Sequence, residues 1–78
     1  MYIDIITPTE QLFSGNVQRV KVPGAKGSFE MLHNHAPIVS ILEKGIITLV
    51  DEDNKSHTFE IDGGVIESAE NKTIVLVD

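Results

Sequence analysis

The sequence predicts an all-β protein of the β-sandwich type, and three observations support this fold class. Apolar and polar side chains alternate with a period of two along the chain, which is typical of strands that bury one face. Turn-forming residues interrupt the alternation about every eight to twelve residues, a spacing that favours a sandwich or a small barrel. No segment has the sustained helical periodicity of an amphipathic helix.

The first half of the chain contains four predicted strands between turn signals. The first strand alternates around Asp4 and ends at the turn that contains Pro8. In the third strand Val20 and Val22 share one face, and the Pro23-Gly24 turn follows. We predict these strands near residues 2–7, 10–14, 17–23 and 27–32.

The second half contains five further predicted strands. The alternation is strictest where His57, Phe59 and Ile61 share one face, between turn signals at Asp53-Asn54 and Gly63-Gly64. We predict these strands near residues 38–42, 45–52, 55–61, 64–69 and 72–77.

Some strands carry apolar residues on both faces, in the runs Ile46-Ile47, Val65-Ile66 and Ile74 to Val77. In a sandwich only one face of each sheet meets the internal core. The second apolar face is then either shielded by loops of the same domain or covered by another subunit. The sequence leaves both alternatives open.

Size and charge limit the classes of function. The 78 residues suffice for one domain, residues 1–78, and the absence of cysteine excludes disulfides and thiolate zinc sites. The net charge is −6, and all of it lies in residues 40–78, where nine acidic residues stand against three lysines. Nucleic acids and anionic membranes bind clustered Lys and Arg, so we expect neither as a partner.

The beginning of the chain and its apolar runs bear on its location. The chain starts at Met1 and enters its first strand directly, without the charged and apolar regions of a signal peptide. Its apolar runs are far shorter than the ~20 residues that a membrane helix needs. We expect a soluble, cytosolic protein without direct membrane insertion.

Histidines are the main candidates for a chemical site. His33 and His35 alternate, so a strand would place both imidazoles on one face, and His57 is a candidate third metal ligand. The face of His57 also carries Phe59 and Ile61, so a packed histidine is the better interpretation. No serine, cysteine or lysine has a recognisable nucleophile context, and no Gly-rich phosphate loop precedes a helix. We predict no catalytic residue, no metal and no cofactor.

Two alternative functions come from other classes of protein. A carrier domain of the lipoyl or biotinyl type would present its lysine on a hairpin tip, where Lys55 follows Asp53-Asn54. The residues expected directly beside such a lysine are absent. A small metal-binding protein built on the histidines is the other alternative.

Eight short motifs follow one another in a fixed order along the chain. They are Ile5-Ile6-Thr7-Pro8, Leu12-Phe13-Ser14-Gly15, Val20-Lys21-Val22-Pro23-Gly24, Gly27-Ser28-Phe29, His35-Ala36-Pro37, Gly45-Ile46-Ile47, Gly63-Gly64-Val65-Ile66-Glu67 and Thr73-Ile74-Val75-Leu76-Val77-Asp78. In this order and spacing they resemble the N-terminal β-sandwich of the epsilon subunit of F-type ATP synthase, called delta in mitochondria. The similarity covers essentially all 78 residues.

The resemblance implies a ten-stranded β-sandwich of two packed sheets in the central stalk of the enzyme. It implies a non-catalytic rotor subunit that contacts the gamma subunit and the ring of c subunits. The subunit would couple ion-driven rotation of the ring to ATP synthesis, peripherally at the cytoplasmic face of the bacterial inner membrane. A rigid body with two contact surfaces serves this role, in agreement with the surplus of apolar faces.

The resemblance also implies two sets of contact residues. Those expected to face the c ring are Ser28, Phe29, Glu30 and His35. Those expected to face gamma are Leu12, Phe13, Val17, Ala36, Val39 and Ile66. Alternation cannot place Leu12 and Phe13 both inside, so at least one of them should be partly exposed.

The chain departs from the family pattern in two places. His33-Asn34 stand where the family usually has Pro-Gly, and the turn can be kept because Asn tolerates a positive φ. Family members commonly continue into two C-terminal helices that inhibit hydrolysis and, in some bacteria, bind ATP, whereas this sequence stops at Asp78. If the sequence is complete, we expect no C-terminal helices and neither of these forms of regulation.

Overall fold

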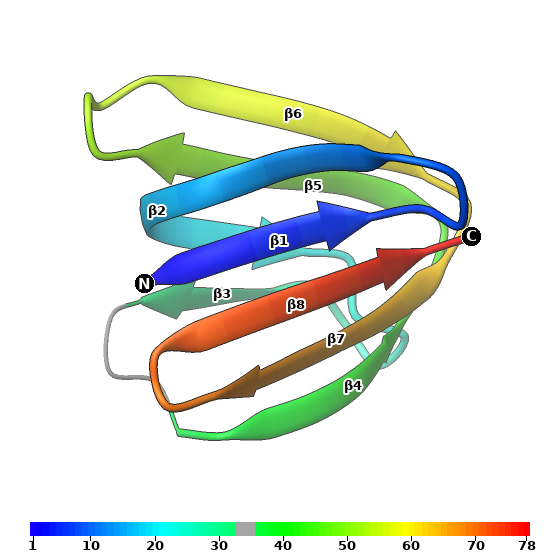
Figure 1. The fold of residues 1–78 in the computed structure, drawn as a ribbon. Coiled ribbons are helices and arrows are strands. Elements are labelled where there is room, and N and C mark those ends of the chain that lie inside the picture. The colour runs from blue at the N-terminus through cyan, green and yellow to red at the C-terminus, as the bar shows by residue number, and fades with distance from the viewer. Residues whose placement is uncertain (33–35) are drawn as a thin grey trace.

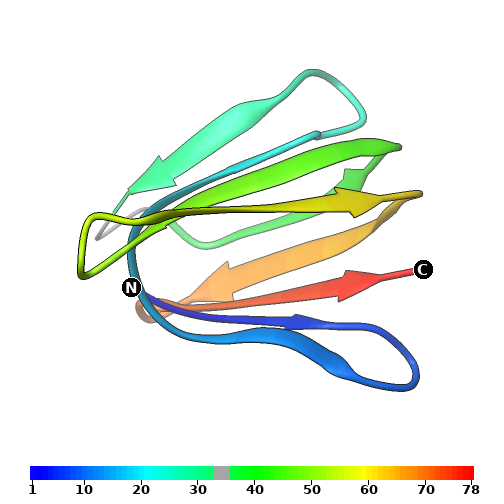
Figure 2. The same ribbon diagram turned by 90° about the horizontal axis from the view of Figure 1, so that it is seen from above.

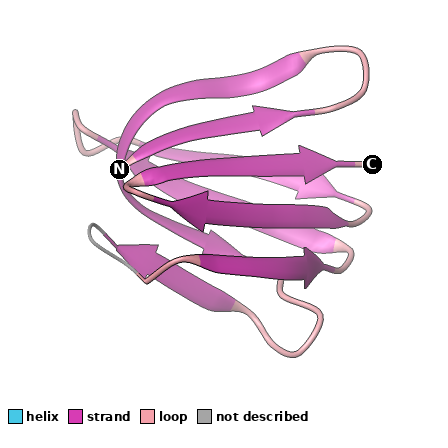
Figure 3. Ribbon diagram, turned by 60° about the horizontal axis from the view of Figure 1, so that its bottom comes forward, coloured by secondary structure: helices cyan, strands magenta, loops and turns pink. Residues whose placement is uncertain are grey.

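The computed structural model describes residues 1–32 and 36–78 of the chain. These residues form eight strands and, within the two described ranges, no helix (Figure 3). The described part therefore contains no helix that could cross a membrane. The strands are β1 (Tyr2–Ile6), β2 (Gln11–Val22), β3 (Phe29–Leu32), β4 (Ile38–Leu42), β5 (Gly45–Asp51), β6 (Ser56–Ile61), β7 (Gly64–Ala69) and β8 (Lys72–Val77).

The strands belong to one sheet that folds over on itself into two layers (Figures 1 and 2). Along the sheet the order is β4-β7-β8-β1-β2-β5-β6, and β3 also pairs with β2. The front layer contains β4, β7, β8, β1 and the first half of β2. The back layer contains the second half of β2 with β3, β5 and β6. Most pairs are antiparallel, but β1 and β8 run parallel in the middle of the front layer.

Strand β2 joins the two layers because it is twelve residues long and pairs with different neighbours along its length. Its residues up to Asn16 pair with β1, whereas its residues from Val17 onward pair with β5 and, further along, with β3. The expected count of ten strands in two separate sheets is not confirmed, since eight strands form one sheet in the described residues. The strands predicted near 10–14 and 17–23 are one continuous strand, while the other seven lie within two residues of their predicted ends.

The core lies between the layers and receives the inward side chain of every second strand residue. One polar pair lies in it, because the hydroxyl oxygens of Ser68 and Thr73 are 2.9 Å apart and satisfy each other's hydrogen-bonding capacity. The buried apolar cluster consists of Met1, Ile3, Ile5, Val17, Val20, Val22, Met31, Leu42, Ile47, Leu49, Ile61, Ile66, Val75 and Val77.

The turn between β2 and β3 ties the back layer to β4 of the front layer. The N–H of Ala25 donates to the carbonyl of Ile41 at 2.9 Å, and the N–H of Glu43 donates to the carbonyl of Pro23 at 2.8 Å. Glycine is required at position 24, because a Cβ there would lie 2.6 Å from the carbonyl oxygen of Gly27. The tight turn predicted for this segment is confirmed.

Candidate docking surface

The outer face of the front layer carries a continuous row of apolar side chains. Ile41 of β4 lies opposite Val65 of β7, Val65 opposite Leu76 of β8, and Leu76 opposite Ile6 of β1. Directly opposed residues on neighbouring strands point to the same face and touch one another. The row therefore crosses four strands without a polar interruption.

A second row lies beside the first, two residues further along each strand. Val39 lies opposite Glu67, Glu67 opposite Ile74, and Ile74 opposite Asp4. Together the two rows form the surface that we call the apolar face, which consists of Ile6, Val39, Ile41, Val65, Ile74 and Leu76 with the carboxylates of Asp4 and Glu67 among them.

The apolar face is well exposed in this chain. Val39 is 72% exposed, Ile41 69%, Leu76 55% and Val65 38%. Burying apolar surface is favourable by about 25 cal/mol per Å² removed from water. A contiguous exposed apolar patch on a sheet therefore marks a surface that gains stability when a partner covers it.

The residues expected to face the c ring are only partly surface residues. Ser28 and Glu30 are exposed, whereas Phe29 is half-buried and its ring packs against the core. The carboxylate of Glu30 lies 3.9 Å from the guanidinium Nε of Arg19 on the neighbouring strand. His35 lies outside the described residues.

The residues expected to face gamma separate into three groups. Val39 belongs to the apolar face, and Ala36 is exposed just before β4. Val17 and Ile66 are core residues, exposed by 1% and 0%. A side chain without exposed surface cannot contact a partner while the domain keeps this fold, so these two are removed from the contact set.

Leu12 and Phe13 form the third group, and both are half-buried against the core. Ile5 lies opposite Phe13 but Ile6 lies opposite Gln11, so Leu12 is an extra residue in a β-bulge. The bulge interrupts the alternation, which allows two consecutive side chains to pack against the core while each stays partly exposed. The prediction that at least one of them is partly exposed is confirmed.

Sequence reasoning did not single out five residues of the apolar face, namely Ile6, Ile41, Val65, Ile74 and Leu76. The signal for three of them was present, because the runs Val65-Ile66 and Ile74 to Val77 are apolar on both faces. The sequence alone did not show which member of each run points outward. Strand registry decides this, and it turns Ile66 toward Val75 in the core and Val65 toward Leu76 outside.

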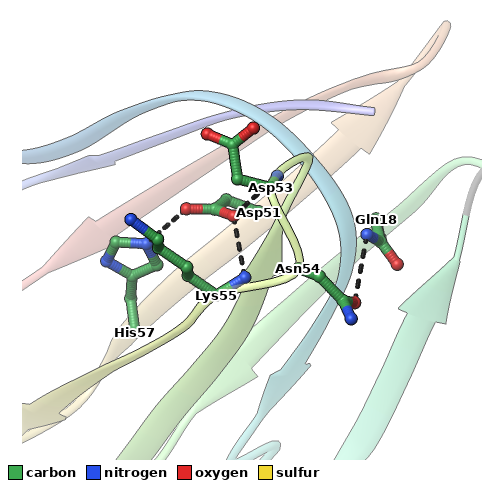
Figure 4. Close-up of polar contacts among 6 residues, drawn as sticks. All are labelled: Gln18, Asp51, Asp53, Asn54, Lys55 and His57. Atoms are coloured by element: carbon green, nitrogen blue, oxygen red, sulfur yellow. Dashed lines mark hydrogen bonds and ion pairs between the residues drawn. The ribbon is translucent and has the colours of Figure 1, made fainter.

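A polar cluster organises the turn between β5 and β6 (Figure 4). The carboxylate of Asp51 accepts hydrogen bonds from the N–H of Asp53 at 2.9 Å and of Lys55 at 3.0 Å. Its other oxygen lies 2.8 Å from Nε2 of His57. The hydrogen bond with His57, followed by that from the Lys55 backbone, lowers the pKa of Asp51 below its usual range. These hydrogen bonds stabilise the hairpin, and His57 is bonded to Asp51.

The two alternative functions gain no support from this geometry. His57 contacts Asp51, and its ring centroid lies 5.3 Å from that of Phe13, while His33 and His35 lie outside the described residues. Within the described ranges no three potential ligands gather around a common point. Lys55 lies on the hairpin tip expected for a carrier lysine, but the family findings below do not favour a carrier domain.

The fold and the surface define a class of protein: a small all-β domain whose front layer presents an apolar outer face. The sequence profile of the family described as ATP synthase, Delta/Epsilon chain, beta-sandwich domain matches residues 1–78. The chain belongs to this family, and the resemblance seen in its motifs is confirmed.

Curated relatives agree with this assignment. The ATP synthase epsilon chain of Chlorobaculum tepidum is 40% identical over 76 residues, which cover 97% of this chain and 86% of that protein. The epsilon chain of Maricaulis maris is 43% identical over 67 residues, which cover 86% of this chain and 50% of that protein. This chain thus spans most of the first relative and half of the second.

Solved structures share the fold at low sequence identity. A chain of the Euglena gracilis mitochondrial ATP synthase, solved as OSCP/F1/c-ring, matches 96% of this chain with a TM-score of 0.90 and 18% identity. That match covers 48% of the Euglena chain. A chain of the Tetrahymena thermophila mitochondrial ATP synthase, from its central stalk and c ring, matches 97% of this chain with a TM-score of 0.81 and 17% identity. The match covers 61% of the Tetrahymena chain.

Proposed function

We propose that the chain is a non-catalytic central-stalk subunit of an F-type ATP synthase, and that residues 1–78 act in it as one rigid domain. The observation that carries the proposal is the family match along all 78 residues, in a fold whose front layer leaves an apolar face exposed. In this role the domain links the gamma subunit to the c-subunit ring and transmits rotation without catalysing a reaction.

The proposed gamma-binding surface is the apolar face with Ala36 beside it. Val39 and Ile41 are its most exposed members, and both lie on β4 at one end of the sheet order. The partly exposed edges of Leu12 and Phe13 remain in the proposal as minor contacts. Burial of this surface would supply the hydrophobic core that stable protein interfaces have.

The proposed c-ring contact comprises Ser28, Phe29 and Glu30, with His35 from the sequence motif. The described members of this set lie where the β2–β3 turn enters β3, whereas the apolar face lies on the front layer. The two proposed surfaces adjoin, because Phe29 lines a hollow together with Val39 and Ile41. Two contact surfaces on one rigid body fit a subunit that transmits torque. The location that follows is peripheral, on the cytoplasmic face of a bacterial inner membrane.

Co-purification tests the proposal. When this chain and the gamma subunit of the same organism are expressed together, we expect a 1:1 complex that survives size-exclusion chromatography. The control is each protein alone, with folding checked by circular dichroism. Two folded proteins that elute separately at micromolar concentration would overturn the proposal.

A further inference from the structure

Glu67 is one of the two carboxylates within the apolar face. It lies on β7 with its neighbours fixed by registry: Val39 on one side and Ile74 on the other. Val65, two residues before it on the same strand, belongs to the neighbouring apolar row. The carboxylate thus projects from the second row of the surface that the proposed function places against gamma, with Lys72 in the next row on the same side of the sheet.

No cation of the described residues neutralises Glu67. The ion pairs within residues 1–32 and 36–78 join Arg19 to Glu30 and His57 to Asp51. Lys72, on the neighbouring strand β8, instead lies over the Tyr2 ring, 5.9 Å from its centroid. Glu67 is exposed, so water solvates its charge in the free domain.

Docking of an apolar partner would remove that water. A buried carboxylate without a cation is strongly unfavourable, and the cost would offset the gain from covering the surrounding aliphatic side chains. A surface that is covered permanently with Glu67 inside it therefore favours a partner that supplies a cation, since Lys72 lies over the Tyr2 ring. Charge complementarity thus selects among partners.

A second copy of this chain does not meet the requirement. The apolar face carries two carboxylates, Glu67 and Asp4, and none of its residues is basic, so the same face of a second copy would supply no cation. Asp4 is partly compensated, because the side-chain amide of Gln11 donates to it at 3.3 Å. Two strand spacings, about 10 Å, separate the strands that carry the two carboxylates.

We propose that Glu67 is the specificity-determining residue of the gamma-binding surface and pairs with a lysine or arginine of gamma that packs against the apolar face. The pair forms only when the interface closes, so it aligns the two proteins and excludes apolar surfaces without a base. This inference rests on the proposed docking of gamma. It adds that the docking surface of gamma carries a base beside apolar side chains.

The test compares the affinity of gamma for the wild-type chain with that for Glu67→Gln, measured by isothermal titration calorimetry. We expect Glu67→Gln to bind about tenfold more weakly or worse, because the basic residue of gamma loses its partner when buried. Glu67→Asp, which keeps the charge on a shorter side chain, should retain more affinity than Glu67→Gln. The matched control is Glu60→Gln, an exposed carboxylate on β6 in the back layer, whose affinity should stay within about twofold of wild type.

The direction of the change in gamma affinity caused by Glu67→Gln decides whether the inference stands. Unchanged or tighter binding by Glu67→Gln would overturn the inference, since the carboxylate would then be either outside the interface or buried without a cation. In that case the proposed function stands if wild type binds and a charge placed at Leu76 abolishes binding. If wild type itself does not bind gamma, the proposed function falls as well. Should Glu67→Gln fail to fold, Glu67→Ala, which also removes the charge, replaces it, and binding as tight as that of Glu60→Gln would overturn the inference.

Discussion

The two outer faces of this domain differ although the same sheet forms both. On the back layer Lys21 lies opposite Thr48 on one side and Glu30 on the other, and Thr48 lies opposite Thr58. On the front layer the corresponding row contains Ile41, Val65, Leu76 and Ile6. Inward positions are apolar in both layers, so the fold requires an apolar inner face of each layer.

The difference shows that the fold does not require the apolar side chains at the outward positions of the front layer. A sandwich needs one apolar face per layer, and most outward side chains of the back layer are polar, with Ile46 and Leu32 as exposed exceptions. The front layer has apolar residues on both faces, which no contact within the described chain explains. The partner proposed for the front layer would account for the asymmetry.

The largest expected effect is on the free energy of unfolding, and it distinguishes the inner face of the front layer from its outer face. Ile66 is 0% exposed and Val65, the preceding residue, is 38% exposed. Replacing Ile66 by Ala should lower the free energy of unfolding by about 2–5 kcal/mol, because it leaves a cavity in the core. Val65→Ala should change it by only about 0.5 kcal/mol. Urea unfolding followed by circular dichroism measures both, and equal losses would mean that Val65 is also a core residue.

A charge on the apolar face tests whether a partner covers it. Leu76→Asp, at a side chain that is 55% exposed, should leave the urea midpoint close to wild type. It should weaken gamma binding by about 30-fold or more, because the interface would bury an unpaired carboxylate. Thr58→Asp on the back layer is the matched control and should bind as wild type does. If the two variants lose affinity equally, the asymmetry between the faces has no functional meaning.

Much of the fold was predictable because strand alternation is a local property. The predicted strands from residue 27 onward match the structure closely, including the ends of β4 and β7. The bend in β2 was not predictable, since Gly15-Asn16 has the same local signal as a hairpin turn. Whether the chain reverses there or continues depends on pairing with β1 and with β5, and β5 is distant in sequence.

The contact surface was predictable only in part. Runs such as Val65-Ile66 show that both faces of a strand are apolar, but they do not show which face is inside. The resemblance to the family placed Val17 and Ile66 in the contact set, and both lie in the core. A single registry shift would exchange inner and outer residues of a strand, so this assignment needs the neighbouring strands.

Replacing Asp51 tests how much its hydrogen bonds stabilise the hairpin between β5 and β6 in the back layer. This hairpin lies at the side of the sandwich where Phe13 of β2 contacts β6. The ring centroid of Phe13 lies 5.3 Å from that of His57 and 6.2 Å from that of Phe59. Asp51→Asn should lower the urea midpoint at neutral pH, because the amide cannot replace the ionised acceptor of three hydrogen bonds. The measurement is a series of urea titrations from neutral pH to about pH 2.

The sign of this pH dependence follows from the lowered pKa of Asp51 in the folded chain. The stabilisation by the carboxylate is complete above its ordinary unfolded pKa of about 3.9 and is lost as the pH falls through the lower folded-state pKa. The difference between wild type and Asp51→Asn should therefore be largest at neutral pH and vanish in acid. A difference that persists at the lowest pH would mean that Asp51 acts through packing rather than through its charge.

The smallest expected effect concerns Ile46, an exposed aliphatic side chain of β5 on the back layer. Ile46 is 52% exposed, close to the 55% of Leu76, so the two residues differ in their surroundings rather than in exposure. Its cross-strand neighbour on β6 is Glu60, and it belongs to no apolar row comparable with that of the front layer. Ile46→Lys should therefore change the free energy of unfolding by no more than about 0.5 kcal/mol and gamma affinity by no more than about twofold. Loss of gamma binding on the scale expected for Leu76→Asp would place the partner on the back layer and reverse the assignment of the two faces.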